Sequence, residues 1–518
     1  MKKVVYILLF LSASKVLLAQ EDQPKDSVKT EVVNVVTSYA PKITDAFKIK
    51  KKPVIQLSKE VDKKEQKYEI ISVPVASTFI PKSGTLKPIK LGEKERLFDN
   101  YFSIGFGNKF NPYLEAYVHR NLNFDSEYRV NLKMNLSADP VDDTVLSSSF
   151  YNADADLFYK QRSHYFDWKV GLIADMDRYN WYGLPTNINF NDQVIDYIES
   201  SQNYKAYEVY GGLEFEDSYI NETNLSVSHF SDKYESDEIN AKFDIDLSFP
   251  LGRFGVNSED LNIGFSSEYL VGGFGQFSDE NFQLTESNYG FLNVGLHPYY
   301  MFNVYNFDVR IGAKGYFTMD TENSTNEFLV YPDASISYPI IKQFANIYVG
   351  AIGDLHNNSY RSLSDLNPYV SPTLDIMQTN QVYNAYAGLK GIIDRTINYN
   401  FKVRYSDEQN KPLFLLNESK SNGNTTGLIN SAAFKGYEFG NSFKVVYDNV
   451  QTLAVVGEAE YDFSRKLSMG VNVAYNLYTL DFQEEAWGLP QISGDIFGVY
   501  KETKWYAGVN IYLSLIHI

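Results

Sequence analysis

Closely spaced acidic residues are the clearest candidates for chemistry in this chain. Asp154 and Asp156 stand two residues apart, and so do Asp244 and Asp246. In an extended strand, this spacing places both carboxylates on the same face. Such a pair could hold a cation, or could serve as the two carboxyl groups of a glycosidase. It could also simply line a wet interior, which is the interpretation that we favour.

Other catalytic patterns are missing from the sequence. The six histidines are scattered, with no pair at the spacing that binds a metal on a helix, and the chain has no cysteine. Gly272, Gly273 and Gly275 do not resemble a phosphate-binding loop, because no helical pattern follows them. We therefore expect no catalytic site, no metal and no cofactor, and we expect that the protein is not an enzyme.

The residues that carry these groups belong to segments with a period of two. Apolar and polar residues alternate through Tyr128–Leu136, Ala241–Phe249 and Tyr399–Tyr405. A period of two predicts strands with one apolar face and one wet face. The alternation starts near Tyr101 and recurs to the end of the chain, so the fold class is predicted to be all-β.

The start of the chain and the aromatic content favour a membrane over a protein core. Lys2 and Lys3 precede the apolar run Val4–Leu11, as in a secretory signal peptide, and no later apolar run is long enough for a membrane helix. Aromatic residues make up 15% of the chain, with 41 tyrosines. Tyrosine suits the interfacial belts of a barrel in lipid. A secreted array of β-sandwiches is the alternative.

The connections between the expected strands fall into two length classes, as in bacterial outer-membrane barrels. Long ones are expected near 139–147, 179–202, 231–238, 274–287, 319–327, 355–379, 416–440 and 481–491. Short ones are expected near 160–164, 217–222, 250–258, 301–305, 339–343, 392–396, 462–466 and 501–504.

This pattern predicts a transmembrane antiparallel β-barrel of roughly 20 or more strands. The first expected strand is Tyr101–Phe110 and the last is Trp505–Leu513, which runs toward the long loops. Bacterial single-chain barrels have an even number of strands. The pattern gives roughly 19 strands between Asp99 and the end of the sequence, an odd number. We therefore expect that the sequence is incomplete at its C-terminus; the alternative is that this strand count is off by one.

Three regions are expected: a signal peptide at 1–20, a periplasmic or pseudo-plug segment at 21–98, and the barrel at 99–518. Segment 21–98 has 16 Lys and Arg against 11 Asp and Glu, although the whole chain carries a net charge of −18. The segment could lie in an acidic lumen as a plug, or could be a solvated linker. The acidic barrel argues against binding to nucleic acid.

Two stretches resemble known receptors. Glu31-Val32-Val33-Asn34-Val35-Val36-Thr37 resembles the start of the TonB-dependent receptors, and Trp487–Pro490 with Lys504-Trp505 resembles their late strands. The resemblance implies a receptor-like barrel in the outer membrane of a Gram-negative bacterium. Segment 21–98 is shorter than the plug of that family, so we expect a plug that is absent or much reduced.

The resemblance also implies partners. Glu31, Val32, Val33, Val35 and Val36 could add a strand to a periplasmic energy-coupling protein, or could be an unpaired linker. The other partners implied are outer-membrane lipid and an unknown small solute.

The leading functional hypothesis is a receptor or transporter that passes or binds a solute through a polar lumen. Strand parity assigns Arg129, Lys133, Asp244 and Asp246 to the lumen-facing side. The alternative is a non-transporting scaffold that anchors surface or periplasmic partner proteins. A hydrolase with its residues on the outer rim is a third hypothesis.

Overall fold

Strands that pair in sequence order make up most of the described chain. The computed structural model describes residues 98–251, 260–278, 284–342, 344–427 and 433–516. They form one 19-stranded antiparallel sheet, in which each strand pairs with the next one along the chain. The all-β prediction is confirmed. The expected signal peptide and segment 21–98, apart from Phe98, lie outside the described residues.

The strands are β1 (Asn100–Gly107), β2 (Asn111–Asn121), β3 (Ser126–Ser137), β4 (Phe150–Arg162), β5 (Phe166–Asn180), β6 (Ser201–Phe215), β7 (Ile220–Ser231), β8 (Asp237–Pro250), β9 (Asp260–Ser278), β10 (Leu284–Val304), β11 (Phe307–Asp320), β12 (Thr325–Ile341), β13 (Ala345–His356), β14 (Thr379–Ile393), β15 (Ile397–Leu416), β16 (Phe443–Asp462), β17 (Leu467–Leu480), β18 (Pro490–Lys501) and β19 (Tyr506–Ile516). Two short helices, α2 (Asp192–Tyr197) and α3 (Tyr360–Leu366), lie in connections. Neither described helix is long and apolar enough to cross a membrane.

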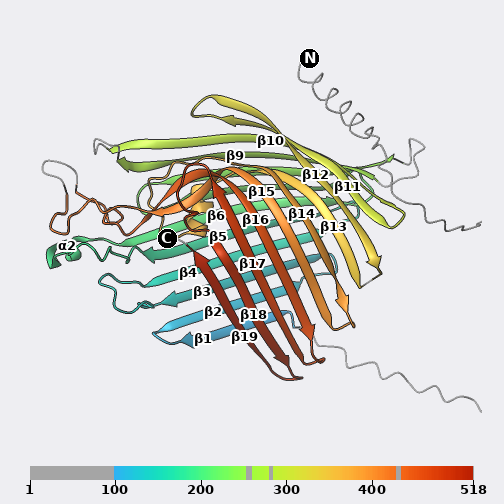
Figure 1. The fold of residues 1–518 in the computed structure, drawn as a ribbon, viewed down its shortest axis with the longest axis horizontal. Helices are drawn as coiled ribbons and strands as arrows, with labels where there is room; N and C mark the ends of the chain where they lie inside the picture. Colours follow the sequence, from blue (N-terminus) through green and yellow to red (C-terminus); the bar gives the residue numbers. More distant parts are fainter. Residues whose placement is uncertain (1–97, 252–259, 279–283, 343, 428–432, 517–518) are drawn as a thin grey trace, which may run out of the picture. The chain divides into compact units, whose positions relative to one another are not determined.

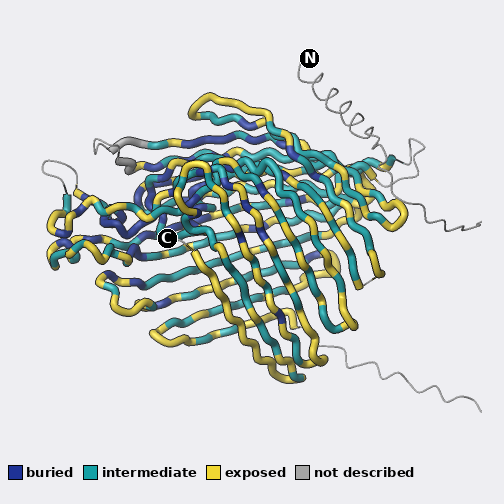
Figure 2. The backbone as a smooth tube through the Cα atoms, viewed as in Figure 1, coloured by how far each residue is buried: buried dark blue, intermediate teal, exposed yellow. Residues whose placement is uncertain are grey.

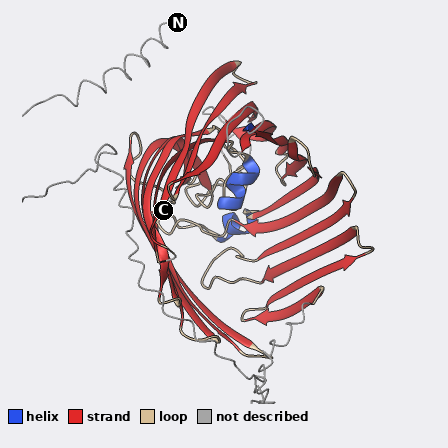
Figure 3. Ribbon diagram, turned by 90° about the vertical axis from the view of Figure 1, so that its right-hand side faces the viewer, coloured by secondary structure: helices blue, strands red, loops and turns tan. Residues whose placement is uncertain are grey.

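The sheet curls around a concave side, which we call the lumen (Figures 1 and 3). Among the described residues, no pairing joins β1 to β19. The last expected strand was placed one residue early, since β19 begins at Tyr506. The first strand ends at Gly107 rather than Phe110, because Lys109 and Phe110 adopt left-handed φ angles of 55° and 50° that turn the chain.

Side chains alternate between the two faces, as the period of two predicts. In β3, Leu132 and Met134 are exposed on one face. Lys133, between them, lies directly opposite Asp154 of β4 in the register. Figure 2 shows that the buried residues gather toward one end of the strands, where the long connections lie.

The two length classes of connection are confirmed in part. Connections 138–149, 181–200, 357–378 and 417–442 are long, and they leave the same end of the sheet, the loop end. The connections expected to be long near 231–238 and 319–327 are the short turns 232–236 and 321–324, so those predictions are wrong. The strands there stay paired almost to the turn, as Ser231 with Asp237 and Asp320 with Thr325 show. Residues 279–283, between β9 and β10 in the connection expected near 274–287, lie outside the described residues.

Two long connections form a structure of their own at the loop end. Connections 181–200, which holds α2, and 417–442 pack together, and we call them the loop cap. Its apolar centre contains Val194, Phe434 and Phe439. Asn191 caps α2 by accepting a hydrogen bond from the backbone N–H of Val194, at 2.8 Å. Figure 1 shows α2 at the outer tip of this end.

Candidate functional site

The third long connection folds into the lumen. Residues 357–378, the infolded segment, join β13 to β14 and contain α3. Ser359 and Ser362 form a capping box that starts the helix. Tyr360, Leu363 and Val370 have no exposed surface. They pack in one cluster with lumen-facing residues of β6 to β10: Tyr204, Ala206, Phe230, Leu270, Phe274, Tyr289 and Phe291. Figure 3 shows helical segments inside the curve of the sheet.

Two carboxylates, the buried Glu238 and the partly buried Asp232, hold the start of the infolded segment. Glu238 accepts hydrogen bonds at 2.6 Å from the backbone N–H of Tyr360 and from the Tyr289 hydroxyl. The Tyr360 hydroxyl donates to Asp232 at 2.8 Å. Burial raises the pKa of Asp232, in the connection 232–236, above its ordinary value. Buried carboxylates must have donors, and Tyr360 supplies two of them.

An arginine of the infolded segment forms ion pairs with two strands of the sheet. Arg361 lies 3.0 Å from Asp175 of β5 and 3.3 Å from Glu208 of β6. A guanidinium can bind two carboxylates at once because its donors form a rigid fork. Asp365, one turn further along the segment, is partly buried, and this raises its pKa although Arg361 acts in the opposite direction.

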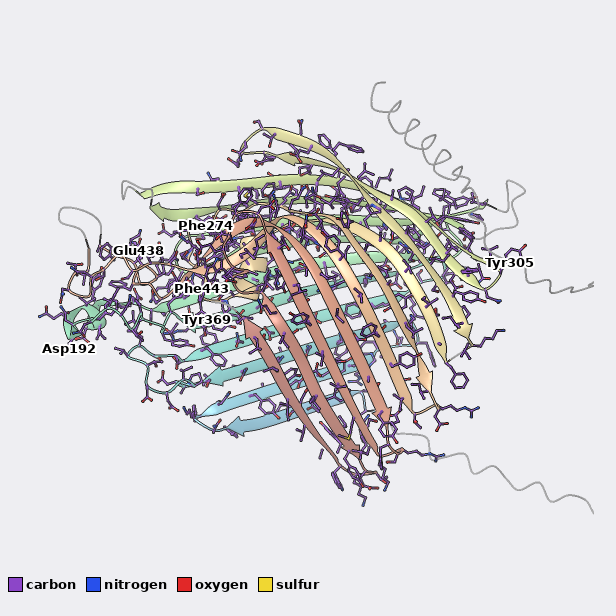
Figure 4. All side chains as sticks on the ribbon, viewed as in Figure 1. Asp192, Phe274, Tyr305, Tyr369, Glu438 and Phe443 are labelled. Carbon is purple, nitrogen blue, oxygen red and sulfur yellow. The ribbon has the colours of Figure 1, made fainter. Side chains whose placement is uncertain are left out.

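The other side of the infolded segment is tied to the loop-end half of β16. The backbone N–H of Ser371 donates to the Phe443 carbonyl at 2.8 Å, and that of Phe443 donates to the Tyr369 carbonyl at 2.9 Å. The Tyr447 hydroxyl donates to the Asp375 carbonyl at 2.9 Å. Figure 4 shows Tyr369 close to Phe443. The segment therefore bridges two separate groups of strands.

An acidic cavity lies beside the segment. Its volume is about 280 Å³, and Lys133, Asp154, Asp177 and Asp365 are among its lining residues. Lys133, one of the four residues assigned to the lumen, therefore shares a cavity with one acidic candidate, Asp154. The other candidate of that pair, Asp156, lies 3.7 Å from Arg129, whose guanidinium also stacks on the Phe158 ring at 4.4 Å.

The second acidic pair lies apart from the first. Asp244 and Asp246 follow Glu238 at even spacing along β8, so they share its face of the sheet. In the register they lie opposite Ser266 and Gly264 of β9. The structure brings neither acidic pair into a group of three or more metal-binding side chains within the described residues. The five residues proposed to add a strand to a periplasmic partner, Glu31, Val32, Val33, Val35 and Val36, lie outside the described residues.

Sequence reasoning missed the residues that hold the infolded segment. Tyr360 and Arg361 were assigned only to a long loop, and Asp232 and Glu238 to a connection. A signal was present: 357–378 contains the apolar residues Leu363, Val370, Leu374 and Ile376, although connection 181–200 of the loop cap also contains several. Apolar residues in a long connection indicate that it has a surface to cover.

Comparisons with known proteins identify the fold. The FrpB iron transporter of Neisseria meningitidis matches with a TM-score of 0.54 at 9% identity, over 80% of this chain and 69% of that chain. The copper transporter OprC matches at 0.55 and 12% identity, over 82% and 68%. The pyoverdine receptor FpvA of Pseudomonas aeruginosa matches at 0.52 and 11% identity, over 79% and 66%.

No family model and no curated protein sequence matches the chain. At such low identity the structural likeness concerns the fold. It is the fold of a TonB-dependent receptor-like outer-membrane β-barrel, as the sequence predicted, and the chain spans about two thirds of the length of these structures.

Proposed function

We propose that this protein is an outer-membrane receptor or transporter that binds a solute at the loop end and passes it through the lumen. The observation that carries this proposal is the infolded segment, which lies across the lumen and is held by buried polar contacts. A barrel of this size has a lumen wide enough for a channel, so an element inside it controls passage. The similar structures are transporters and receptors, and we propose no enzymatic activity.

The exposed surface supports a place in lipid. Apolar residues such as Leu172 and Val227 are exposed near the middle of their strands. Exposed aromatic residues stand in most of the described turns at the end opposite the loop end: Phe124, Tyr165, Tyr219, Tyr305, Phe344, Phe463 and Trp505. Such a row fits one interfacial belt of an outer-membrane barrel. Segment 1–20 would direct export.

Within this proposal, Arg129, Lys133, Asp244 and Asp246 line the path of the solute. The acidic side chains on β4, β5 and β8 would favour cations on that wall of the lumen. Arg361 of the infolded segment offsets part of this charge at Asp175 and Glu208.

The register offers a direct test. His356 and Thr379, the last and first paired residues of β13 and β14, lie opposite each other. A two-residue Asn-Gly turn can therefore replace 357–378 without changing the pairing of the strands. We expect this variant to conduct more in a planar bilayer than the wild-type protein. Equal conductance, with both proteins shown to be folded, would argue against the role of the segment as a barrier.

A scaffold is the second candidate. It is favoured by how completely the segment is buried, since Tyr360, Leu363 and Val370 have no exposed surface. A scaffold needs no passage, so it predicts that no solute changes the current through the wild-type protein. A current that responds to solute excludes a purely anchoring role.

Energy coupling is a separate proposal. Glu31, Val32, Val33, Val35 and Val36 would add a strand to a periplasmic coupling protein, since added strands bind mainly through backbone hydrogen bonds. Deleting 31–37 should then abolish co-purification with that protein and leave the conductance unchanged. If the coupling protein still co-purifies after the deletion, residues 31–37 do not mediate the contact.

A further inference from the structure

A second cavity at the loop end differs in character from the acidic one. It measures about 740 Å³, and its walls come from the infolded segment, β13 to β16, β19 and the connections 181–200 and 481–489. Four aromatic side chains line it: Tyr182, Tyr369, Phe414 and Phe443. We call this cavity the aromatic pocket. Its volume is within the range of small-molecule sites.

The rings of the aromatic pocket are held in place by their surroundings. Tyr182 packs edge-to-face on Tyr369, with the ring centroids 5.7 Å apart. The backbone N–H of Phe443 donates a hydrogen bond to the Tyr369 carbonyl, which holds the main chain of these two residues together. The backbone N–H of Phe414 donates to the Trp487 carbonyl at 3.3 Å. Gly488 has a φ of +76°, which lets the connection turn against Phe414. The pocket is preformed, so binding a ligand costs little free energy for ordering the side chains of the pocket.

The charges that line the aromatic pocket cancel. Its charged lining residues in the described part of the chain are Glu408 and Lys411, which form an ion pair at 2.5 Å. The acidic cavity has three carboxylates against one lysine among its lining residues. A charged ligand would gain little in the aromatic pocket, where no unpaired charge of opposite sign faces it.

Polar groups at the edge of the pocket complete its chemistry. Asn358, Asn367 and His356 line the pocket beside the rings. The Asn358 amide nitrogen already donates to the Met377 carbonyl and the Thr379 hydroxyl, and the Asn367 side-chain oxygen accepts from the backbone N–H of Tyr369. The groups that remain for a ligand are the Asn358 side-chain oxygen, the Asn367 amide nitrogen and the His356 ring. Flat apolar walls with a few polar groups at the edge match a ligand whose ring has an apolar face and a rim of hydroxyl groups.

We propose that the aromatic pocket binds an uncharged ring compound that carries several hydroxyl groups. A sugar ring and a neutral polyphenol share this chemistry. The inference rests on the proposed receptor function and adds the class of its solute.

Calorimetric titration of the detergent-solubilised protein tests the inference, with cellobiose and catechin as the two neutral probes and glucuronate and glucosamine as charged ones. We expect at least one neutral probe to bind more tightly than both charged ones. Tyr182→Ala should weaken that binding about tenfold, the loss of roughly one ring contact. Tyr182→Phe should retain it, because the ring remains.

Two further variants separate a lost contact from a lost fold. Phe414→Leu keeps an apolar side chain but removes the ring, so it should weaken binding as well. Tyr165→Ala, which removes an exposed tyrosine in a turn at the opposite end, should leave binding unchanged.

The inference is overturned if a charged probe binds more tightly, if neither neutral probe binds, or if Tyr182→Ala and Phe414→Leu bind like the wild type. Should the Asn-Gly replacement of 357–378 raise conductance while neither neutral probe binds, the proposed function stands and the solute class is wrong.

Discussion

The infolded segment and the loop cap are both built from long connections at the same end of the sheet, but they are stabilised differently. The loop cap packs its apolar residues against one another, with Phe434 and Phe439 meeting edge-to-face. The infolded segment packs on the strands and is anchored by carboxylates of β8 and its neighbouring turn. The path of a connection is thus decided by the partners that the strands offer, and less by the composition of the connection.

The strongest test of this contrast exchanges one buried ring in each region for alanine. Tyr360 and Phe439 both have no exposed surface, so each change should cost about 3–5 kcal/mol of local stability. Tyr360→Ala also removes the hydroxyl that donates to Asp232, although the backbone N–H that donates to Glu238 remains, so the segment should leave the lumen and conductance should rise. Phe439→Ala should loosen the loop cap with unchanged conductance. Bilayer recordings measure the conductance of both variants. Equal changes in conductance would contradict the proposed difference between the infolded segment and the loop cap.

A second test compares a cation in each region. Arg361→Gln should raise the permeability of K⁺ relative to Cl⁻ by ~2-fold, because Asp175 and Glu208 lose their counter-charge beside the solute path. Lys420→Gln removes the partner of Glu438 in the loop cap and should leave selectivity unchanged. Reversal potentials in a KCl gradient measure both. An unchanged potential in the arginine variant would place Arg361 outside the conducting path.

The pH dependence of docking offers a third test. The native pKa of Asp232 is raised above the ordinary value of 3.8 by burial. Between 3.8 and the raised pKa, the docked form holds more protons than the released form, so docking is tightest at low pH and weakens as pH rises through the raised pKa. Protease cleavage within 357–378 should therefore increase with pH. Asp232→Asn should reduce the slope of this profile, and the raised pKa of Asp365 would account for part of what remains. A profile that the substitution leaves unchanged would show that Asp232 does not contribute to it.

The smallest effect is expected far from both regions. Lys466 and Glu502 pair at 2.7 Å between two turns at the end opposite the loops, on exposed surface. Exposed pairs contribute little because water and salt screen them. Glu502→Gln should leave conductance, selectivity and the thermal midpoint unchanged within error. A clear loss of conductance would show that the two ends of the strands are coupled.

Local pattern predicted the strands well, for a physical reason. Alternation places Leu132 and Met134 on one face and Lys133 on the other in any curled sheet, whatever lies far away in the chain. The turn at 501–504 and the connection at 355–379 were predicted within a few residues, since a break in alternation is also local.

The site depended on distant pairs that no local pattern encodes. Nothing near Glu238 indicates that it will accept from Tyr360, more than a hundred residues later. The turns 232–236 and 321–324, which were predicted to be long, are short for a related reason. Polar residues at strand ends resemble loop residues until the partner strand is known, and here they continue the pairing of β7 with β8 and of β11 with β12.

The direct opposition of His356 and Thr379 has an evolutionary consequence. A segment inserted between two strands that already meet is modular, because the wall does not depend on its length or sequence. Homologous barrels could exchange such inserts and thereby acquire new selectivity while keeping the scaffold. The same position would accept an engineered insert.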